Sequence, residues 1–88
     1  MKIREGFILR DVAGKSFVVA TGELSREFQG MITLNETGKF IWQQIEAGKD
    51  AEQITEAIVA EFDDADKDVV AADVEKFIDK LVKGKIVE

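Results

Sequence analysis

The sequence has no cysteine, histidine, tyrosine or proline among its 88 residues. Without cysteine the chain can form no disulfide, offers no thiolate nucleophile and builds no cysteine-based metal site. Without histidine it lacks the commonest general acid–base and the commonest metal ligand of proteins. The absence of proline leaves every helix free of a forced kink. We therefore expect a protein that is not an enzyme, with no catalytic residues, no cofactor and no metal.

Long apolar runs are also missing from this chain. None approaches the roughly 18–20 residues that a membrane-spanning helix needs. The amino-terminal MKIREGF lacks the apolar stretch of a signal peptide. We expect a cytoplasmic protein that does not contact membranes. A chain of 88 residues is expected to fold as one domain, residues 1–88, around a single modest core.

The charge of the chain is negative and unevenly distributed. The formal net charge is −6, and residues 50–68 alone hold eight acidic side chains against one base, Lys67. An acidic domain repels the phosphate backbone of nucleic acids. We therefore expect no nucleic-acid partner, and peptides or proteins are the better candidates.

The amino-terminal third of the sequence has the pattern of a small sheet. Residues 7–12 and 16–20 are short runs of apolar and β-branched residues that flank Ala13-Gly14-Lys15, which predicts a β-hairpin. Residues 30–34 predict a third strand, after a polar connection of uncertain shape at residues 21–28. Consecutive strands with short links favour an antiparallel meander in the order 1-2-3.

From Asn35 onward the apolar residues follow a helical period. A first helix is predicted between Asn35, which suits an N-cap, and Gly48, with Trp42 in the core that clamps this helix to the sheet. A second begins at Asp50, which has Gln53 three residues later in a capping-box arrangement. A third begins within residues 64–68 and ends near Lys83.

Residues 85–87 predict a short final strand after the helices. The predicted fold class is thus α+β and winged helix-turn-helix-like, with a three-stranded antiparallel β-meander followed by three α-helices.

One stretch resembles a calcium-binding loop. Asp64, Asp66, Asp68 and Glu75 match positions 1, 3, 5 and 12 of an EF-hand. The match fails at position 6, where Val69 replaces the glycine that makes the sharp turn. An apolar stripe that requires a helix also begins there. We interpret the stretch as a helix amino terminus and not as a metal site.

A helix-turn-helix arrangement also raises the possibility of DNA binding. The third predicted helix carries Lys76, Lys80 and Lys83, which could reach a phosphate backbone. It carries Asp73 and further acids among them, so its charges are balanced and entry into a DNA groove is disfavoured.

The strand at residues 30–34 is the most informative segment. In a 1-2-3 meander it is an edge strand, and soluble proteins usually protect such edges with charge or proline. No charged residue lies between Glu27 and Glu36. A helix or loop of the same chain, or a second copy, could cover this edge. The functional alternative is that a strand from another chain completes the sheet.

The stretch that joins this strand to the first helix resembles a known family. LNETGKFIWQQIEAGK, residues 34–49, is similar to the strongest motif of the PqqD-like family, in which a Leu-Asn-Glu/Pro-Thr turn leads into a helix with Ile-Trp and then Gly. ITEAIVAEFD and VEKFIDKLVKGKIVE resemble the family's second and third helices. One departure is Gly38, where the family often has Ala.

The resemblance implies a function in the biosynthesis of ribosomally made, modified peptides. Family members are recognition elements that bind the leader segment of a precursor peptide as an added strand beside the third strand. The third helix walls the groove, and the domain presents the precursor to a modifying enzyme, typically a radical S-adenosylmethionine enzyme. Pyrroloquinoline quinone (PQQ) biosynthesis is one such pathway.

Carried over to this sequence, the resemblance predicts two groups of peptide-binding residues. They are Gly30, Met31, Ile32, Thr33 and Leu34 on the edge strand, and Val69, Val70, Asp73, Val74, Phe77 and Lys80 on the third helix. The expected partners are a precursor peptide and its modifying enzyme. The alternatives are a winged-helix regulator that binds DNA, and a homodimeric structural module that pairs through its third strand.

Overall fold

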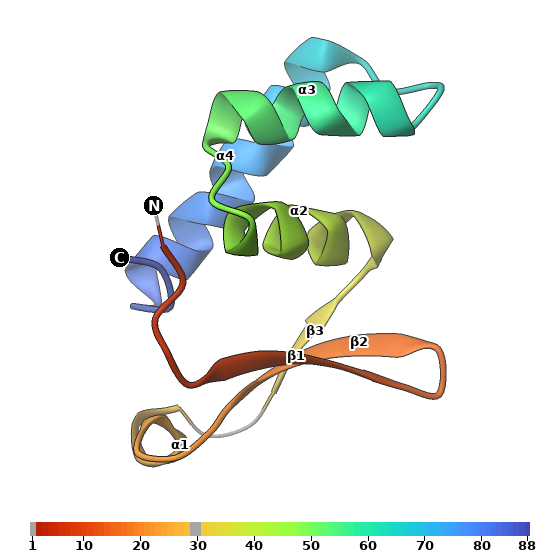
Figure 1. The fold of residues 1–88 in the computed structure, drawn as a ribbon. Helices are drawn as coiled ribbons and strands as arrows, with labels where there is room; N and C mark the ends of the chain where they lie inside the picture. Colours follow the sequence, from red (N-terminus) through yellow and green to blue (C-terminus); the bar gives the residue numbers. More distant parts are fainter. Residues whose placement is uncertain (1, 29–30) are drawn as a thin grey trace.

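The computed structural model describes residues 2–28 and 31–88 (Figure 1). The elements along the chain are β1 (Phe7–Val12), β2 (Lys15–Ala20), α1 (Leu24–Glu27), β3 (Met31–Leu34), α2 (Glu36–Glu46), α3 (Ala51–Glu61) and α4 (Lys67–Lys83). The three strands form an antiparallel sheet in the order β1-β2-β3. The predicted α+β meander followed by three helices is therefore confirmed, with the short helix α1 as an addition between β2 and β3.

The β1–β2 hairpin closes through a turn of only two residues. Ala13 and Gly14 both have positive φ angles. Positive φ at both central residues is the mark of a type I′ turn, which matches the right-handed twist of the flanking strands. Lys15, which the sequence placed in the turn, consequently belongs to β2 and pairs with Val12.

Helix α1 gives a definite shape to the connection that the sequence left open. It is a single turn without a buried residue, and Phe28 follows it in an extended conformation. The ring of Phe28 lies edge-on to that of Phe7, with the two centroids 5.0 Å apart. This aromatic pair holds the connection against the amino-terminal end of β1.

The first two of the three long helices begin with the capping residues that the sequence predicts, and the third begins within the predicted range 64–68. Asn35 accepts a hydrogen bond of 2.8 Å from the backbone N–H of Gly38. Asp50 and Gln53 form the reciprocal capping box of α3. Asp66 caps α4 and lies within the stretch that resembles a calcium loop, so that stretch is the helix amino terminus of our interpretation.

Among the described residues, none of these helices has the length and apolar character needed to cross a membrane.

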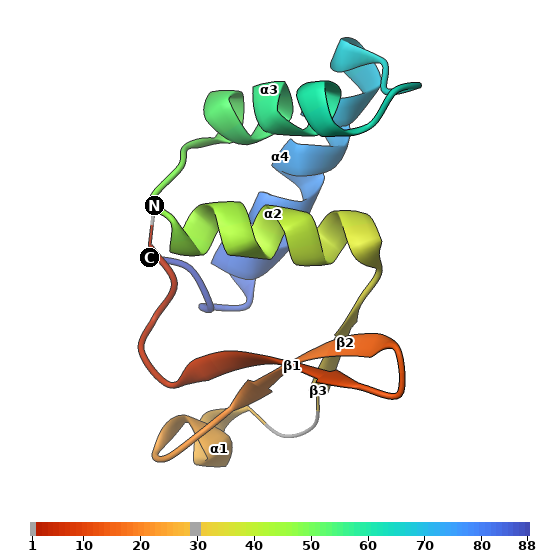
Figure 2. The ribbon, with the colours of Figure 1, turned by 45° about the vertical axis from the view of Figure 1, so that its right-hand side comes forward.

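The helices stack on one side of the sheet. In both views α2 lies between the sheet and α3, and α4 runs behind α2 from the level of α3 down toward the chain termini (Figures 1 and 2). Trp42 is fully buried at the centre of the core, as predicted, together with Ile41, Ile54 and Val74. Among the described residues, the indole Nε1–H of Trp42 has no hydrogen-bond partner.

Gly38 explains how closely α4 approaches the start of α2. A Cβ atom at this position would lie 3.3 Å from the Phe77 ring and 3.5 Å from Cβ of Leu34. Glycine therefore lets Phe77 of α4 pack directly over the turn between β3 and α2. An alanine here would require both the ring and the Asn35 carboxamide, whose Oδ1 would lie 3.2 Å from the new Cβ, to move by a few tenths of an ångström.

Two details at the carboxyl-terminal end differ from the sequence-based expectation. The helical period places Val82 on the apolar face of its helix, but 50% of its surface is exposed, because the core side of that turn is occupied by Leu81. The predicted final strand is reduced to an isolated antiparallel bridge between Ile3 and Val87. The bridge brings both ends of the chain together beside the core (Figure 1).

Candidate functional site: the free edge of β3

Strand β3 lies at one edge of the sheet and pairs only with β2. Its residues Met31 and Ile32 are large and apolar, yet they are 63% and 38% exposed. The opposite edge strand, β1, carries Arg10 and Asp11, charges of the kind that protect an edge from pairing. The two edges of the sheet are therefore unlike, and β3 is the unprotected one.

The backbone of β3 has capacity for further hydrogen bonds. Within residues 2–28 and 31–88, no backbone hydrogen bond joins Met31–Leu34 to any segment beyond the β2–β3 ladder. An antiparallel edge strand presents N–H and C=O groups of alternate residues to the open side. Gly30, the first residue of the predicted edge, lies outside the described residues.

The side chains of β3 alternate between two faces. Leu34 is buried beside Ser16, and Ile32 lies on the same core-facing side beside Val18. Met31 and Thr33 point to the outer face of the sheet. A strand added to this edge would likewise present alternate side chains to the core side and to the outer side.

A small apolar hollow adjoins the amino-terminal half of β3. It has a volume of about 260 Å³ and is lined by Phe7, Val18, Ala20, Glu27, Phe28, Met31 and Ile32. Six of its seven lining residues have apolar side chains. Its one carboxylate, Glu27, lies 3.4 Å from the guanidinium of Arg4. We call this the apolar hollow.

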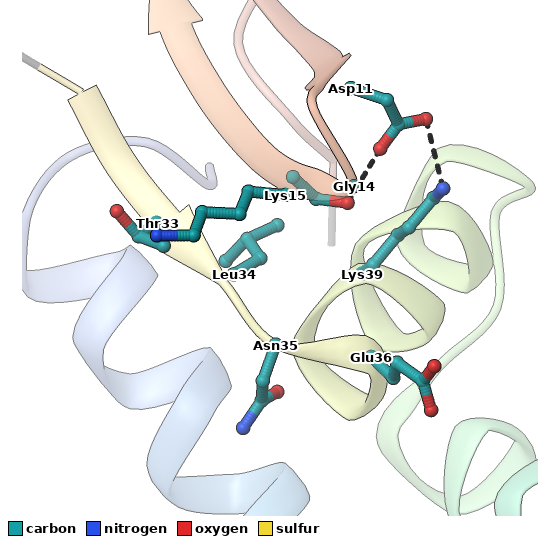
Figure 3. Close-up of a pocket in the computed structure, with 9 residues that line it drawn as sticks. Asp11, Gly14, Lys15, Thr33, Leu34, Asn35, Glu36 and Lys39 are labelled. Carbon is teal, nitrogen blue, oxygen red and sulfur yellow. Dashed lines mark hydrogen bonds and ion pairs between the residues drawn. The ribbon is translucent and has the colours of Figure 1, made fainter.

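A larger polar hollow lies at the carboxyl-terminal end of β3. Its volume is about 530 Å³, and its lining comprises Asp11, Gly14, Lys15, Ser16, Thr33, Leu34, Asn35, Glu36 and Lys39 (Figure 3). We call this the polar hollow. It is formed where the hairpin turn, the end of β3 and the first turn of α2 meet.

Asp11 organises the inner part of the polar hollow. Its carboxylate accepts a hydrogen bond of 2.6 Å from the Ser16 hydroxyl and one of 2.9 Å from the Lys39 ammonium. The Ser16 hydrogen bond and, after it, the Lys39 contact hold the pKa of Asp11 below its usual value of 3.8. This network ties the β1–β2 hairpin to α2.

Lys15 occupies the outer part of the polar hollow. Its side chain points from β2 toward Thr33, which lines the same hollow (Figure 3). The carboxylate of Glu36 points away from Lys15 and Thr33 (Figure 3). Among the ion pairs of the described residues, none involves Lys15.

The structure distributes the predicted residues of α4 over three environments. Val74 is fully buried, so its side chain supports α4 from within the core and offers no surface. Phe77 is partly buried and packs beside Gly38 and Leu34. Lys80 is exposed.

Residues nearer the start of α4 lie at its junction with α3. Val69 is 59% exposed. Val70 and Asp73 line a hollow of about 490 Å³ together with Thr37 of α2 and the end of α3. These residues share the side of α4 that approaches the first turn of α2.

Several residues beside β3 were not identified from the sequence. The floor of the apolar hollow comes from Phe7, Ala20 and Phe28, and the polar hollow depends on Asp11 and Lys15. The apolar Phe28 at the end of a polar connection was the available signal, since an aromatic there has to pack against something. The Asp11–Lys39 contact joins positions 28 residues apart and left no local signal.

Together these features define a class of small α+β domain, with a winged helix-turn-helix-like arrangement and an open third strand. The model of one protein family, described as coenzyme PQQ synthesis protein D (PqqD), matches residues 7–87. The chain belongs to the PqqD family.

A comparison with solved structures finds a similar fold. A solved structure entitled "TbiB1 in Complex with the TbiA(beta) Leader Peptide" is similar to this chain with a TM-score of 0.80. The two sequences are 25% identical, and the match covers 100% of this chain and 95% of the other. A search of curated proteins finds no match.

Proposed function

We propose that this protein is a non-catalytic adaptor that binds the leader segment of a ribosomally made precursor peptide and presents the precursor to a modifying enzyme. Membership of the PqqD family and likeness to TbiB1, whose structure contains a leader peptide, support this function. In this proposal residues 1–88 act together as one peptide-recognition domain.

The observation that carries the proposal is the unpaired backbone of Met31–Leu34. A peptide in an extended conformation can form a fourth strand there, because main-chain groups on the open side of β3 have no partner among the described residues. The exposed side chains of Met31 and Ile32 add apolar surface that such a strand would cover.

The energetics of strand addition are compatible with specific binding. Each ladder hydrogen bond contributes a net gain of roughly 0.5–1.5 kcal/mol. Apolar side chains of the peptide add about 25 cal/mol for each Å² removed from water. Ordering a flexible peptide costs roughly 2–5 kcal/mol of this gain. The remainder corresponds to dissociation constants on the order of nanomolar to micromolar.

The proposed contact surface combines the edge with one side of α4. The edge contributes Gly30, Met31, Ile32 and Thr33, with Leu34 beneath them. On α4 the contacts are Val69, Val70, Asp73, Phe77 and Lys80, with Val74 as internal support.

The proposed second partner is the enzyme that modifies the bound precursor. The family relationship favours a radical S-adenosylmethionine enzyme, of the kind that acts in PQQ biosynthesis. The adaptor would raise the local concentration of the precursor at this enzyme, and the enzyme would carry the chemistry.

The alternative of a DNA-binding regulator gains no support from α4. Asp68, Asp73, Glu75 and Asp79 lie among its lysines, and Lys83 forms an ion pair with Asp79. Acidic side chains in these positions oppose approach to a phosphate backbone.

The experiment that tests the proposal uses the leader of any short precursor peptide whose reading frame is found beside the gene of this protein. Synthetic leader is titrated into isotope-labelled protein, and backbone amide shifts are followed by NMR. We expect the largest shifts at Met31–Leu34, with further shifts along residues 69–80. If the amide signals of Met31–Leu34 do not shift at millimolar peptide, the proposal is contradicted.

Two N-methylated leaders give a matched control for strand addition. In an antiparallel ladder, alternate residues of the added strand direct their N–H groups toward the partner. Methylation of one alternate set should therefore abolish binding, and methylation of the other set should leave it largely unchanged. Equal effects of both sets would show that the peptide does not bind as a strand.

A further inference from the structure

The two ends of the free β3 edge differ in chemistry. The apolar hollow lies beside Met31 and Ile32, and the polar hollow lies beside Thr33 and Leu34. A strand bound along this edge would meet mainly apolar side chains at one end and charged or polar side chains, Lys15 among them, at the other. Such a difference can select both the composition and the direction of the bound strand.

Lys15 is the charged group at the polar end. Its side chain points from β2 toward Thr33, and both residues line the polar hollow (Figure 3). The other lysine of the polar hollow, Lys39, is already engaged by Asp11 at 2.9 Å. Lys15 has no ion-pair partner in the described part of the chain, so it is available to a carboxylate on a bound peptide.

The apolar hollow is placed to receive a side chain on the core-facing side of an added strand. Ile32 and Val18, which line it, occupy neighbouring positions on that face of the sheet. Its volume of about 260 Å³ exceeds the size of one large aliphatic side chain. Its single acid, Glu27, lies within 3.4 Å of Arg4, which leaves no unpaired charge facing the hollow.

These two sites fall on successive positions of a bound strand. A residue opposite Thr33 points to the outer face, where the Lys15 ammonium lies, and a residue opposite Ile32 points to the core side and the apolar hollow. In an antiparallel strand the residue opposite Thr33 comes first. Antiparallel pairing is also the slightly more stable arrangement per residue.

We propose that the β3 edge selects a strand in which an acidic residue, bound by Lys15, is followed directly by a large apolar residue that enters the apolar hollow. This inference rests on the proposed function and specifies the peptide chemistry that the edge recognises. Lys15 is then a specificity-determining residue, although it lies on β2 and not on the edge strand itself.

The test uses four synthetic ten-residue peptides that differ only in their two central residues. These are Glu-Leu, Leu-Glu, Lys-Leu and Glu-Ser, in a common host of alternating Thr and Val. Dissociation constants are measured by NMR titration from the amide shifts of Met31–Leu34. We expect Glu-Leu to bind about fivefold more tightly than Lys-Leu, and about tenfold more tightly than Glu-Ser. Leu-Glu should also bind more weakly than Glu-Leu.

Two variants with the same change in net charge complete the test. K15E should reverse the charge preference, so that Lys-Leu binds more tightly than Glu-Leu. K49E, at an exposed position after α2, should keep the wild-type order. A loss of preference in K49E as large as in K15E would show that only net charge is sensed and would overturn the assignment to Lys15.

The outcomes separate this inference from the proposed function. If all four peptides shift the amide signals of Met31–Leu34 and bind with equal affinity, the edge binds strands without this selectivity. The inference then fails, while the proposed function stands. If no peptide shifts these amides at millimolar concentration, strand addition itself fails. If Leu-Glu binds as tightly as Glu-Leu, the proposed order of the two residues is wrong.

Discussion

At the scale of single residues, Asp11 links three parts of the structure. Its carboxylate accepts hydrogen bonds from Ser16 of β2 and Lys39 of α2 while it stands on β1. Ser16 is buried, so its hydroxyl depends on this partner, whereas Lys39 remains partly exposed. The hairpin is thereby fixed to the helix beside the end of β3.

This network leads to a prediction about acid stability. S16A removes the larger of the two stabilising contacts, so the pKa of Asp11 should rise toward 3.8, and K39Q should raise it less. Because the pKa of Asp11 is lowered in the folded protein, its contribution to stability is present above 3.8 and is lost as the pH falls through the folded-state pKa. S16A should therefore reduce this extra stability at neutral pH.

The measurement is the carboxyl ¹³C shift of Asp11 as a function of pH, together with urea unfolding at neutral pH and below the unfolded-state pKa of 3.8. An unchanged titration midpoint in S16A would show that the Ser16 hydroxyl does not stabilise the charged carboxylate. A midpoint raised more by K39Q than by S16A would reverse the assigned order of causes.

At the scale of elements, the β1–β2 turn carries a residue that fits its backbone poorly. Ala13 has a positive φ. An L-residue with a Cβ atom adopts this left-handed region at a cost of roughly 1–2 kcal/mol. Asparagine tolerates the same conformation, and Asn-Gly is the preferred pair for a type I′ turn. The hairpin is therefore held by its strand pairing and by Asp11 more than by its turn.

We accordingly predict that A13N stabilises the protein by about 0.5–1 kcal/mol. The gain should appear in the free energy of unfolding from urea titration. The control is A72N, at an exposed position inside α4. It should destabilise by up to about 0.7 kcal/mol, because asparagine is a weaker helix former than alanine. Destabilisation by A13N would show that the turn does not have the type I′ backbone.

The capping box of α3 makes a second prediction at this scale. D50A removes the hydrogen bond that the carboxylate accepts from the Gln53 N–H. Loss of this cap should lower the free energy of unfolding by about 1 kcal/mol. The control, D64A, removes the same charge from an exposed position between α3 and α4 and should leave stability nearly unchanged. Thermal unfolding of both variants is measured at one ionic strength, so that the effect of the lost cap can be distinguished from the effect of the lost charge. Equal losses of stability in D50A and D64A would assign the effect to charge alone.

Elements whose boundaries are set locally were predictable from the sequence. Asn35, Asp50 and Asp66 each bond to a backbone N–H two or three residues onward, so neighbouring residues contain the signal. Helix α1 was not predictable, because its position depends on the direct contact of Phe28 with Phe7, which lies far earlier in the sequence. A four-residue helix has no periodicity of its own to detect.

The candidate site was predictable in part for the same reason. The uncharged run at Met31–Leu34 is a local feature, and its exposure in the structure agrees with an unprotected edge. The approach of Lys15 to Thr33 follows from the two-residue turn, which moves Lys15 out of the loop and into β2 (Figure 3). The sequence alone assigned Lys15 to the turn and so gave no indication of this contact.

At the scale of the whole molecule, the two ends of the chain close one side of the core. Ile3 and Val87 form a bridge, Arg4 donates its backbone N–H to the carbonyl of Ile86 at 2.9 Å, and both Ile86 and Val87 are buried. The bridge lies away from β3, which joins the core at the opposite end of α2 (Figure 2). Arg4 reaches from the chain ends to the apolar hollow, where its guanidinium lies 3.4 Å from Glu27, an exposed ion pair that contributes little. Stability and peptide binding should therefore be largely separable.

We predict that I86A destabilises the protein, because Ile86 is buried and its truncation leaves a cavity. The expected loss is about 2–5 kcal/mol. In a domain of this size each kcal/mol lowers the melting temperature by about 4–8 °C, so a large shift is expected. The control is V82A: the Val82 side chain is half exposed, so this change should lower the melting temperature only slightly.

The same variant tests whether stability and binding are separate. At a temperature where I86A remains folded, its affinity for the leader should equal that of the wild type. A weaker affinity in folded I86A would instead mean that closure of the chain ends and the β3 edge are energetically coupled, through Arg4, which bonds to Ile86 and pairs with Glu27 of the apolar hollow.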